Sequence, residues 1–207
     1  MNIVFVRHGR TELNDKHVYA GTIDSEISQN GIEEIKSIKK PLQKIKFYEV
    51  YSSPLKRAVQ TAKLLAENYK IDTRLSEMNF GIFEGLSYSE IESKYVDESK
   101  AWAEDVLNYS IPKGESLIKV FNRTKAFIEE VSSKNDNILV ITHGGVIRSA
   151  LSLVFKQYDY FYKFKVMHGA ASVISIEDGY MYIKAVNCRD NIIAVSYTHL
   201  RAHETSA

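Results

Sequence analysis

The chain has 207 residues, of which 44% are hydrophobic and 26% are charged, and this composition is typical of a globular protein with one well-buried core. Its formal net charge of +1 excludes a field strong enough to make nucleic acid or an anionic membrane the main partner. The single Cys188 excludes an internal disulfide and a cysteine metal cage, and no apolar stretch approaches the about 20 residues of a membrane span. The chain starts with an apolar run and shows no signal-peptide pattern. We therefore expect a cytoplasmic protein, monomeric or homodimeric.

Strand and helix patterns alternate along the chain. Short apolar runs predict strands over residues 3–6, 48–52 and 138–142, and helical spacing of apolar residues predicts helices over residues 31–45, 53–69 and 116–134. Ser53 is the predicted N-cap of the second helix, with Pro54 at the first helical position. Pro41 is expected to kink or end the helix before it.

Residues 172–186 form two β-type runs around Asp178 and Gly179, and an Asp-Gly pair at this place predicts a hairpin. Strands that alternate with helices favour a three-layer α/β/α sandwich with a mainly parallel sheet, to which the hairpin adds an antiparallel edge. We expect one domain over residues 1–194. Residues 195–207 lack apolar periodicity and resemble the translation of a transposase sequencing adaptor, so we predict that they are a non-native tail.

Two histidines come directly after apolar strands. Arg7, His8 and Gly9 follow the first predicted strand, and His143 with two glycines follows the strand over residues 138–142. In open α/β sheets, ligands bind beyond the carboxyl ends of the strands, where the connecting loops diverge. If the two strands are neighbours, both imidazoles face one crevice. The glycines then allow the backbone to turn sharply or to approach a ligand closely.

Four segments carry a pattern that is specific as a set, although each is weak alone. In chain order they are VRHGRTELN, SSPLKRAVQTA, LSEMNFGIFEG and ITHGGVIR. Together they resemble the histidine phosphatase superfamily, which includes cofactor-dependent phosphoglycerate mutases and many small phosphatases. The resemblance runs from Asn2 to about Arg189. It implies a phosphoglycerate mutase-like fold and phosphomonoester chemistry on a small phosphorylated metabolite. The sequence shows no metal motif, and we expect no metal and no cofactor.

These residue types suit phosphoryl transfer through histidine. A neutral imidazole nitrogen of His8 can attack phosphorus, which gives a phosphohistidine that water later hydrolyses. We expect a backbone carbonyl in the following turn to accept a hydrogen bond from the other ring nitrogen and to fix the tautomer. Since the sequence shows no metal motif, Arg7 and Arg57 supply the planar donors that match phosphate oxygens. The resemblance implies that His143 completes the pocket.

Neutral groups are also expected around the phosphate. The resemblance implies that Asn14 and the backbone N–H of Gly144 donate to its oxygens. The other residues that we assign to substrate binding are Thr11, Gly21, Thr22 and Glu84. Arg10 stands where many members of the superfamily carry glutamate, and we interpret His17 as a surface residue.

The leaving oxygen needs a proton, because an alkoxide departs poorly. Glu77 is the general acid that the resemblance implies, and a nearby phosphate would raise its pKa toward a useful range. Glu84 is the rival carboxylate, and separate mutation of the two would decide between them. We interpret Glu115, at the entry to the 116–134 helix, first as a capping residue whose charge in the first turn suits the helix dipole and second as a substrate contact. His168 is interpreted as structural.

The segment between Gly85 and Pro112 is short. Mutases of this superfamily carry an insertion there that holds a phosphorylated cofactor, so hydrolysis is favoured over mutase chemistry. LSEMNFGIFEG, the segment around Trp102 and the C-terminal strands resemble a subgroup, the α-ribazole-5′-phosphate phosphatases of cobalamin lower-ligand assembly. The base of such a substrate stacks on aromatic side chains, for which the candidates are Trp102, Tyr88, Phe83 and Tyr19.

Three other interpretations stay open. The first is a broad-specificity sugar-phosphate or phosphoglycerate phosphatase, and the second is a phosphoglycerate mutase. The third is a catalytically silent member that binds phosphorylated ligands, which is disfavoured because the nucleophile, the arginines and the acid are all present. An unrelated Rossmann-type binder would need a G-x-G-x-x-G turn after the first strand, and RHGRTE lacks it.

Overall fold

The computed structural model describes residues 1–134, 136–190 and 192, and the predicted non-native tail lies outside them. At its centre is a six-stranded sheet in the order β3-β2-β4-β1-β5-β6. The strands are β1 (Asn2–Arg7), β2 (Glu49–Ser52), β3 (Lys70–Ile71), β4 (Ile138–Thr142), β5 (Ala171–Glu177) and β6 (Tyr180–Cys188). β1 to β4 run parallel, whereas β5 lies antiparallel to β1 and β6 antiparallel to β5. The predicted mainly parallel sheet with an antiparallel edge is confirmed.

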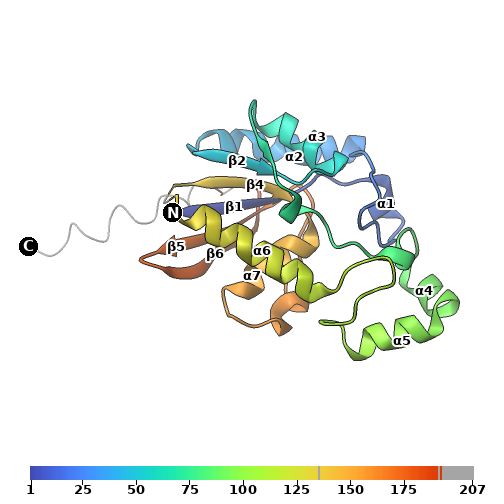
Figure 1. The fold of residues 1–207 in the computed structure, drawn as a ribbon. Coiled ribbons are helices and arrows are strands. Elements are labelled where there is room, and N and C mark those ends of the chain that lie inside the picture. The colour runs from blue at the N-terminus through green and yellow to red at the C-terminus, as the bar shows by residue number, and fades with distance from the viewer. Residues whose placement is uncertain (135, 191, 193–207) are drawn as a thin grey trace, which may run out of the picture.

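Helices cover both faces of the sheet, as expected for a three-layer sandwich. They are α1 (Glu12–Asp15), α2 (Gln29–Gln43), α3 (Lys56–Leu65), α4 (Tyr88–Lys94), α5 (Val96–Glu104), α6 (Leu117–Ser132) and α7 (Gly144–Leu153), with 3₁₀ turns η1 (Thr73–Leu75), η2 (Gly81–Phe83) and η3 (Asp159–Lys163). α2 and α3 lie on one side of the sheet and α6 and α7 on the other, while α4 and α5 lie to one end (Figure 1). Within the described part of the chain, none of these helices has the length and hydropathy of a membrane span.

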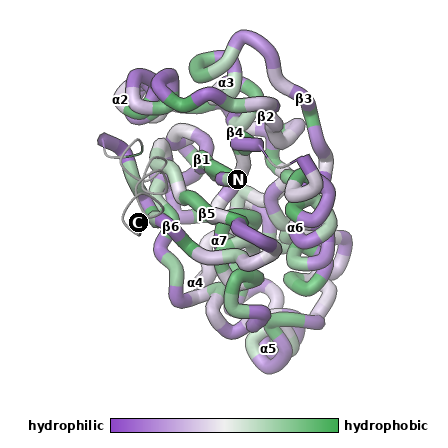
Figure 2. The backbone as a smooth tube through the Cα atoms, turned by 90° about the vertical axis from the view of Figure 1, so that its left-hand side faces the viewer, coloured by the Kyte–Doolittle hydropathy of each residue, from purple (hydrophilic) through white to green (hydrophobic). Residues whose placement is uncertain are grey.

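Alternate residues of the central strands enter two separate cores. Phe5 of β1 belongs to the core that includes residues of α6 and α7, and its neighbour Val4 belongs to the core that includes residues of α2 and α3. Val140 and Leu139 of β4 divide in the same way. Because side chains of a strand point alternately to the two faces, an apolar run such as Ile138–Thr142 fills both cores at once. Figure 2 shows the two helical layers from the side, with hydrophobic and hydrophilic residues alternating along the helices.

The predicted helix over residues 116–134 is confirmed as α6. Its buried residues are Leu117, Val120, Phe121, Thr124, Phe127, Ile128 and Val131, which repeat at helical spacing. α2 continues through Pro41 and ends two residues later at Gln43, so the proline stands in the last turn. The hairpin is also confirmed, since Glu177 pairs with Tyr180 across the turn. Asp178 and Gly179 there have φ of +50° and +78°, the left-handed backbone that this turn requires.

The predicted start of α3 is wrong. The helix begins at Lys56, and its N-cap residue, Leu55, makes no side-chain cap. The hydroxyl of Ser53 instead lies 2.7 Å from Nε2 of His143. A partner 90 residues away in sequence therefore occupies the group that local helix capping would use.

The predicted place of Glu115 in the first turn of the long helix is also wrong, because α6 starts at Leu117. The Glu115 carboxylate accepts hydrogen bonds from the backbone N–H of Asn79 at 3.0 Å and from Arg123 at 3.1 Å. These contacts join the segment after η1 to α6. Tertiary hydrogen bonds again replace an interaction with the nearest helix end.

β1 and β4 are direct neighbours, with Arg7 opposite Thr142. The backbone N–H of His8 donates to the carbonyl of Thr142 at 3.0 Å. His8 and His143 therefore leave the sheet side by side at the carboxyl ends of two adjacent parallel strands. This is the arrangement on which the prediction of a shared crevice depends.

Candidate active site

His8 stands in the turn after β1 and is 2% exposed. Its Nδ1 lies 2.8 Å from the carbonyl oxygen of Gly9. Because a carbonyl can only accept, Nδ1 carries the proton and Nε2 keeps its lone pair. Burial, reinforced by the positive charges of Arg57 and Arg7, holds the pKa of His8 well below its ordinary value. The ring is therefore neutral, as a nucleophile must be.

Arg57 faces His8 from the first turn of α3. Its Nε donates to Nε2 of His8 at 3.3 Å, while the two Nη atoms donate to the carbonyls of Ile23 at 2.8 Å and Gly21 at 2.7 Å. The guanidinium plane is thus held on both sides. Gly21 has φ of +46°, and a Cβ there would lie 2.1 Å from a carboxylate oxygen of Glu84. The loop that holds Arg57 requires glycine at this position.

Arg7 is the last residue of β1 and points into the same space. Its Nη1 donates to the carbonyl of Val166 at 2.6 Å. Its Nε is buried and has no hydrogen-bond partner among the described residues. Burial lowers the pKa of Arg7 to about 10, a change that Glu77 opposes. The side chain is therefore still charged at neutral pH, with donors available to an anion.

His143 is the N-cap residue of α7 and is fully buried. Its ring centroid lies 5.0 Å from that of His8. The Ser53 hydroxyl contacts Nε2 at 2.7 Å, and this oxygen also accepts from the backbone N–H of Leu55 at 3.3 Å. Nδ1 is buried and is not hydrogen-bonded to any described residue. Burial and the charge of Arg57 hold the pKa of His143 well below its ordinary value, so this ring is neutral too.

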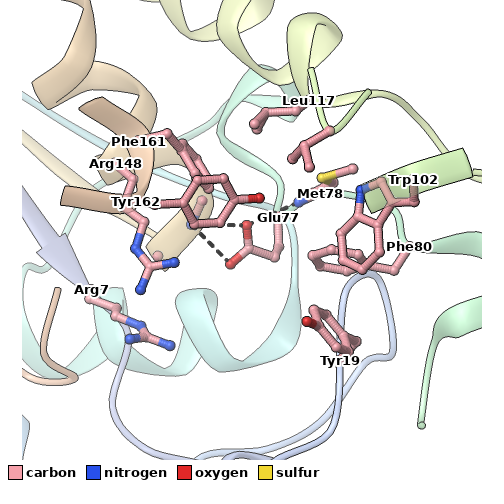
Figure 3. A pocket seen from close by; sticks show the side chains of 13 residues that line it. Arg7, Tyr19, Glu77, Met78, Phe80, Trp102, Leu117, Arg148, Phe161 and Tyr162 are labelled. Carbon is pink, nitrogen blue, oxygen red and sulfur yellow. Dashed lines mark hydrogen bonds between the residues drawn. The ribbon is translucent and has the colours of Figure 1, made fainter. Parts of the chain in front are cut away.

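Glu77 lies at the N-terminus of α7. Its two carboxylate oxygens accept from the backbone N–H of Gly145 at 3.1 and 3.3 Å, and Oε1 also accepts from the N–H of Met78 at 3.0 Å (Figure 3). A Cβ at Gly145 would lie 2.3 Å from Oε1, so glycine makes the space that the carboxylate fills. The positive end of a helix dipole faces this group.

Two cavities adjoin at these residues. We call the first, of about 130 Å³, the phosphoryl cavity; its lining is Arg7, His8, Asn14, Val18, Tyr19, Ala20, Gly21, Arg57, Glu77 and Phe80. The second, of about 190 Å³, is the aromatic cavity; its lining is Arg7, Tyr19, Glu77, Met78, Phe80, Trp102, Val106, Leu117, Gly144, Gly145, Arg148, Phe161 and Tyr162 (Figure 3). Glu77 lines both cavities, so one carboxylate stands where the two cavities meet.

Asn14 is the amide side chain of the phosphoryl cavity. Its side-chain oxygen accepts from the backbone N–H and the hydroxyl of Thr11, both at 3.0 Å. The amide nitrogen is therefore the group left for a ligand. Thr11 is fully buried and caps α1, so it positions Asn14 from behind. Gly144 packs against Arg7, since a Cβ there would lie 3.2 Å from the guanidinium carbon.

Glu84 and Thr22, like Thr11 and His143, are absent from the linings of both cavities, and they bind each other. One carboxylate oxygen of Glu84 accepts from the backbone N–H of Thr22 at 2.6 Å, from the Thr22 hydroxyl at 2.9 Å and from the backbone N–H of Phe80 at 3.2 Å. Their contacts tie the loop around Gly21 to η2, and this loop in turn holds Arg57.

Comparison with known proteins agrees with this geometry. Residues 3–189 match the family model of the histidine phosphatase superfamily (branch 1). The chain belongs to the histidine phosphatase superfamily. It is 30% identical over 185 residues to Phosphoserine phosphatase 1 of Hydrogenobacter thermophilus, which covers 86% of this chain and 88% of the relative. It is 29% identical over 196 residues to Adenosylcobalamin/alpha-ribazole phosphatase of Salmonella typhimurium, which covers 91% of this chain and 97% of the relative.

The fold of this histidine phosphatase also matches solved structures. The crystal structure of alpha-ribazole phosphatase from Shigella flexneri has a TM-score of 0.84 at 27% identity, over 91% of this chain and 97% of that one. The predicted phosphoglycerate mutase-like architecture is thus confirmed.

Sequence reasoning missed the position of His168 in this histidine phosphatase. Its ring meets that of His8 edge-on, with centroids 5.3 Å apart. Its Nε2 is buried and lacks a partner in the described part of the chain, and burial together with the charge of Arg7 lowers its pKa to about 3. The residue lies between η3 and β5, where no periodic pattern marks it. The pairing of Gly169 N–H with the carbonyl of Arg7 at 3.1 Å brings this segment to the end of β1.

Arg148 was also missed, although a signal for it exists. It lies four residues after Gly144 on α7, and residues at this spacing share one helix face. Its guanidinium carbon lies 5.7 Å from the ring centre of Phe161, over the aromatic cavity. Its Nε is buried and unpaired in the described ranges. This histidine phosphatase therefore places a further cation beside Glu77, outside the phosphoryl cavity.

The remaining sequence candidates separate clearly. Tyr19 and Trp102 line the aromatic cavity, whereas Phe83 is buried behind Trp102, with ring centroids 5.5 Å apart, and Tyr88 is 46% exposed. Arg10 pairs with carboxylates outside both cavities. No group of three or more His, Cys, Asp or Glu suited to a metal ion occurs in the residues that the structure describes.

Proposed function

We propose that this histidine phosphatase hydrolyses phosphomonoesters through a phosphohistidine on Nε2 of His8. The observation that carries the proposal is the hydrogen bond from Nδ1 to the Gly9 carbonyl, which leaves an unprotonated Nε2 in a cavity with Arg7 and Arg57. A neutral imidazole is a competent nucleophile, and preorganised cationic donors stabilise the charge that develops on the phosphoryl oxygens.

In the first step Nε2 of His8 attacks phosphorus, and the bond from phosphorus to the ester oxygen breaks. Glu77, which lines both cavities, enters this step protonated and gives its proton to the leaving oxygen. The equatorial oxygens receive hydrogen bonds from Arg7, Arg57 and Asn14, and from Nδ1 of His143. The products of the step are the alcohol and the phosphohistidine.

In the second step water attacks the same phosphorus from the side that the alcohol has left. Glu77, now ionised, takes a proton from this water, and the phosphorus–nitrogen bond breaks. Inorganic phosphate leaves, Nε2 regains its lone pair, and Glu77 is again protonated for the next cycle. The hydrogen bond from Nδ1 to Gly9 keeps the tautomer unchanged throughout.

For the substrate we propose α-ribazole 5′-phosphate, a nucleotide of cobalamin lower-ligand assembly. The aromatic cavity supports this choice, because rings from four parts of the chain surround it: Tyr19, Phe80, Trp102, Phe161 and Tyr162. Aromatic side chains favour stacking with a planar base. The 29% identity with the Salmonella alpha-ribazole phosphatase is a second support.

A second candidate substrate is a phosphomonoester whose alcohol carries a carboxylate, such as phosphoserine or a phosphoglycerate. The observation that favours it is the position of Arg148. This cation lines the aromatic cavity together with Glu77, and its buried Nε has no hydrogen-bond partner among the described residues. The 30% identity with Phosphoserine phosphatase 1 agrees with it. A guanidinium matches a carboxylate with two parallel hydrogen bonds.

A hydrolysis panel tests both the reaction and the substrate. The rates with α-ribazole 5′-phosphate, phosphoserine, 3-phosphoglycerate and p-nitrophenyl phosphate are measured for the wild type and for His8→Ala. We expect release of inorganic phosphate by the wild type alone, with kcat/KM more than about tenfold higher for the ribazole ester than for the others. Acid-labile label trapped on a residue other than His8, or isomerisation of phosphoglycerate, would overturn the reaction. A preference for phosphoserine would select the second candidate.

A further inference from the structure

Trp102 carries a buried donor for which the protein supplies no acceptor. The side chain comes from α5 and is 8% exposed, and it lines the aromatic cavity. Its Nε1 is fully buried, with no hydrogen-bond partner in the described residues. A buried indole N–H is usually paired, because leaving it unpaired costs the free energy of its lost hydration. An unpaired donor on the wall of a cavity therefore points to an acceptor on the molecule that fills it.

The surroundings of the indole explain why no side chain satisfies it. The neighbouring lining residues are apolar: Met78, Phe80, Val106 and Leu117. Glu77 is the carboxylate of this cavity, but it is held at the N-terminus of α7 by the N–H groups of Gly145 and Met78. In Figure 3 the indole nitrogen lies on the edge of the ring that faces Met78 and the interior of the cavity.

The position of Trp102 relative to the phosphoryl cavity sets what can reach it. Tyr19 and Phe80 line both cavities, and the indole centroid lies 5.6 Å from the ring of Tyr19 and 6.3 Å from that of Phe80. The rings of Tyr19 and Phe80 therefore border both the space beside His8 and the space beside the indole. A leaving group that reaches Nε1 must extend past these two rings.

Rigid neighbours keep the donor in place. The indole packs against the fully buried Phe83, with ring centroids 5.5 Å apart, and α5 follows directly on α4. A ring fixed on one side by the core has its N–H direction determined before a ligand binds. Preorganised polar groups of this kind provide orientation and specificity in otherwise apolar sites.

We propose that Trp102 is a specificity-determining residue that reads the alcohol part of the substrate. Its Nε1–H donates to an unprotonated ring nitrogen of a planar heteroaromatic group that stacks between Tyr19, Phe80 and the rings of η3. This rests on the proposed phosphomonoesterase function and deepens it. A benzimidazole that carries the sugar on one nitrogen offers such an acceptor on the other nitrogen. An aromatic group without a ring acceptor leaves the indole N–H unpaired.

A pair of substrates and a pair of variants test the proposal. The substrates are the benzimidazole riboside 5′-phosphate and its indole analogue, in which CH replaces the acceptor nitrogen. Trp102→Phe keeps a ring in the cavity and removes the donor. Tyr180→Phe is the matched control, because it also removes one polar atom from an aromatic residue, on a β6 side chain that is 72% exposed. The quantity measured is the ratio of kcat/KM for the two substrates.

We expect the wild type and Tyr180→Phe to prefer the benzimidazole ester by about tenfold, the usual effect of leaving one buried donor unpaired. For Trp102→Phe, the ratio of kcat/KM for the two esters should be near one. A change in protein stability affects both rates equally, so the ratio reports recognition alone. If the wild type hydrolyses both esters equally well, the inference fails and the phosphatase function stands. If it hydrolyses neither but cleaves p-nitrophenyl phosphate, the choice of a heteroaromatic substrate fails. If it cleaves none of the three, the proposed function itself fails.

Discussion

The Nε–H of Arg57 donates to Nε2 of His8 over 3.3 Å, while both Nη atoms of the same guanidinium are bound to backbone carbonyls. The hydrogen bond requires a lone pair on Nε2, so the arginine and the Gly9 carbonyl define the same tautomer from opposite sides of the ring. Both contacts exist before any phosphate is bound. The His8 imidazole, our proposed nucleophile, is thus oriented by the fold itself.

Arg57→Lys should therefore lower kcat/KM by about 10²-fold or more, although the charge is kept. A lysine is a point charge without the planar fork, so it cannot hold the two carbonyls of Ile23 and Gly21 while it also contacts His8. Steady-state hydrolysis of p-nitrophenyl phosphate measures the effect. Lys63→Ala, on the exposed side of the same helix, is the control and should leave the rate unchanged. A near-wild-type rate for Arg57→Lys would show that charge alone suffices.

Ser53→Ala tests the contact that replaces the expected helix cap. The Ser53 oxygen accepts from the N–H of Leu55, and a hydroxyl proton donated to Nε2 of His143 would leave Nδ1–H as a donor toward phosphate. Without the hydroxyl the tautomer is no longer fixed, and we expect kcat/KM to fall about tenfold, the equivalent of about 1.4 kcal/mol. Ser52→Ala is the control, because Ser52 is equally buried and its hydroxyl donates only to the carbonyl of Ser53. Equal losses in the two variants would contradict the role of Ser53.

Glu77→Gln and Glu84→Gln separate the two candidate acids. The proton matters most when the leaving alcohol is a poor one, so Glu77→Gln should reduce kcat by about 10²-fold for an alkyl phosphate and much less for p-nitrophenyl phosphate. Glu84→Gln weakens the contacts to Thr22 and Phe80, so it should affect both substrates alike. The ratio of the two rates is the measurement. A leaving-group effect in Glu84→Gln instead would reverse the assignment.

Acid should destabilise the unliganded protein through its buried histidines. Burial lowers the pKa of His8, His143 and His168, the last to about 3. Below the ordinary histidine pKa of about 6.5, the unfolded chain binds protons that the folded protein excludes, so the free energy of unfolding falls as the pH falls. Together, the three histidines should lower the free energy of unfolding by about 3 kcal/mol between pH 6.5 and pH 5.5.

Urea unfolding at a series of pH values measures this dependence. His168→Gln should reduce the loss over this range by about one third, since one of the three excluded protons is removed. His17→Gln is the control. His17 is an exposed loop residue, so its substitution should leave the pH dependence of the free energy of unfolding unchanged. If the two variants behave alike, the proton linkage does not pass through His168.

The central strands and the long helix could be predicted because their signals are local. Val4 and Phe5 alternate between two cores, and the stripe from Leu117 to Val131 repeats at helical spacing, so a short window of sequence contains the whole pattern. The short β3 at Lys70–Ile71 escaped detection, since two exposed residues carry no such pattern. The Asp178-Gly179 turn was predictable for a different reason, namely the backbone conformation that these residues tolerate.

By itself, the sequence determined which strands end in Arg7-His8 and in His143, but it left open whether these two strands are neighbours in the sheet. Only the tertiary structure decided which side chains complete the site. Ser53 binds His143 rather than capping α3, Glu84 binds Thr22, and His168 packs against His8 from a segment without periodicity. Backbone pattern is set by neighbours in sequence, whereas a buried polar side chain takes the partner that packing brings within hydrogen-bond distance.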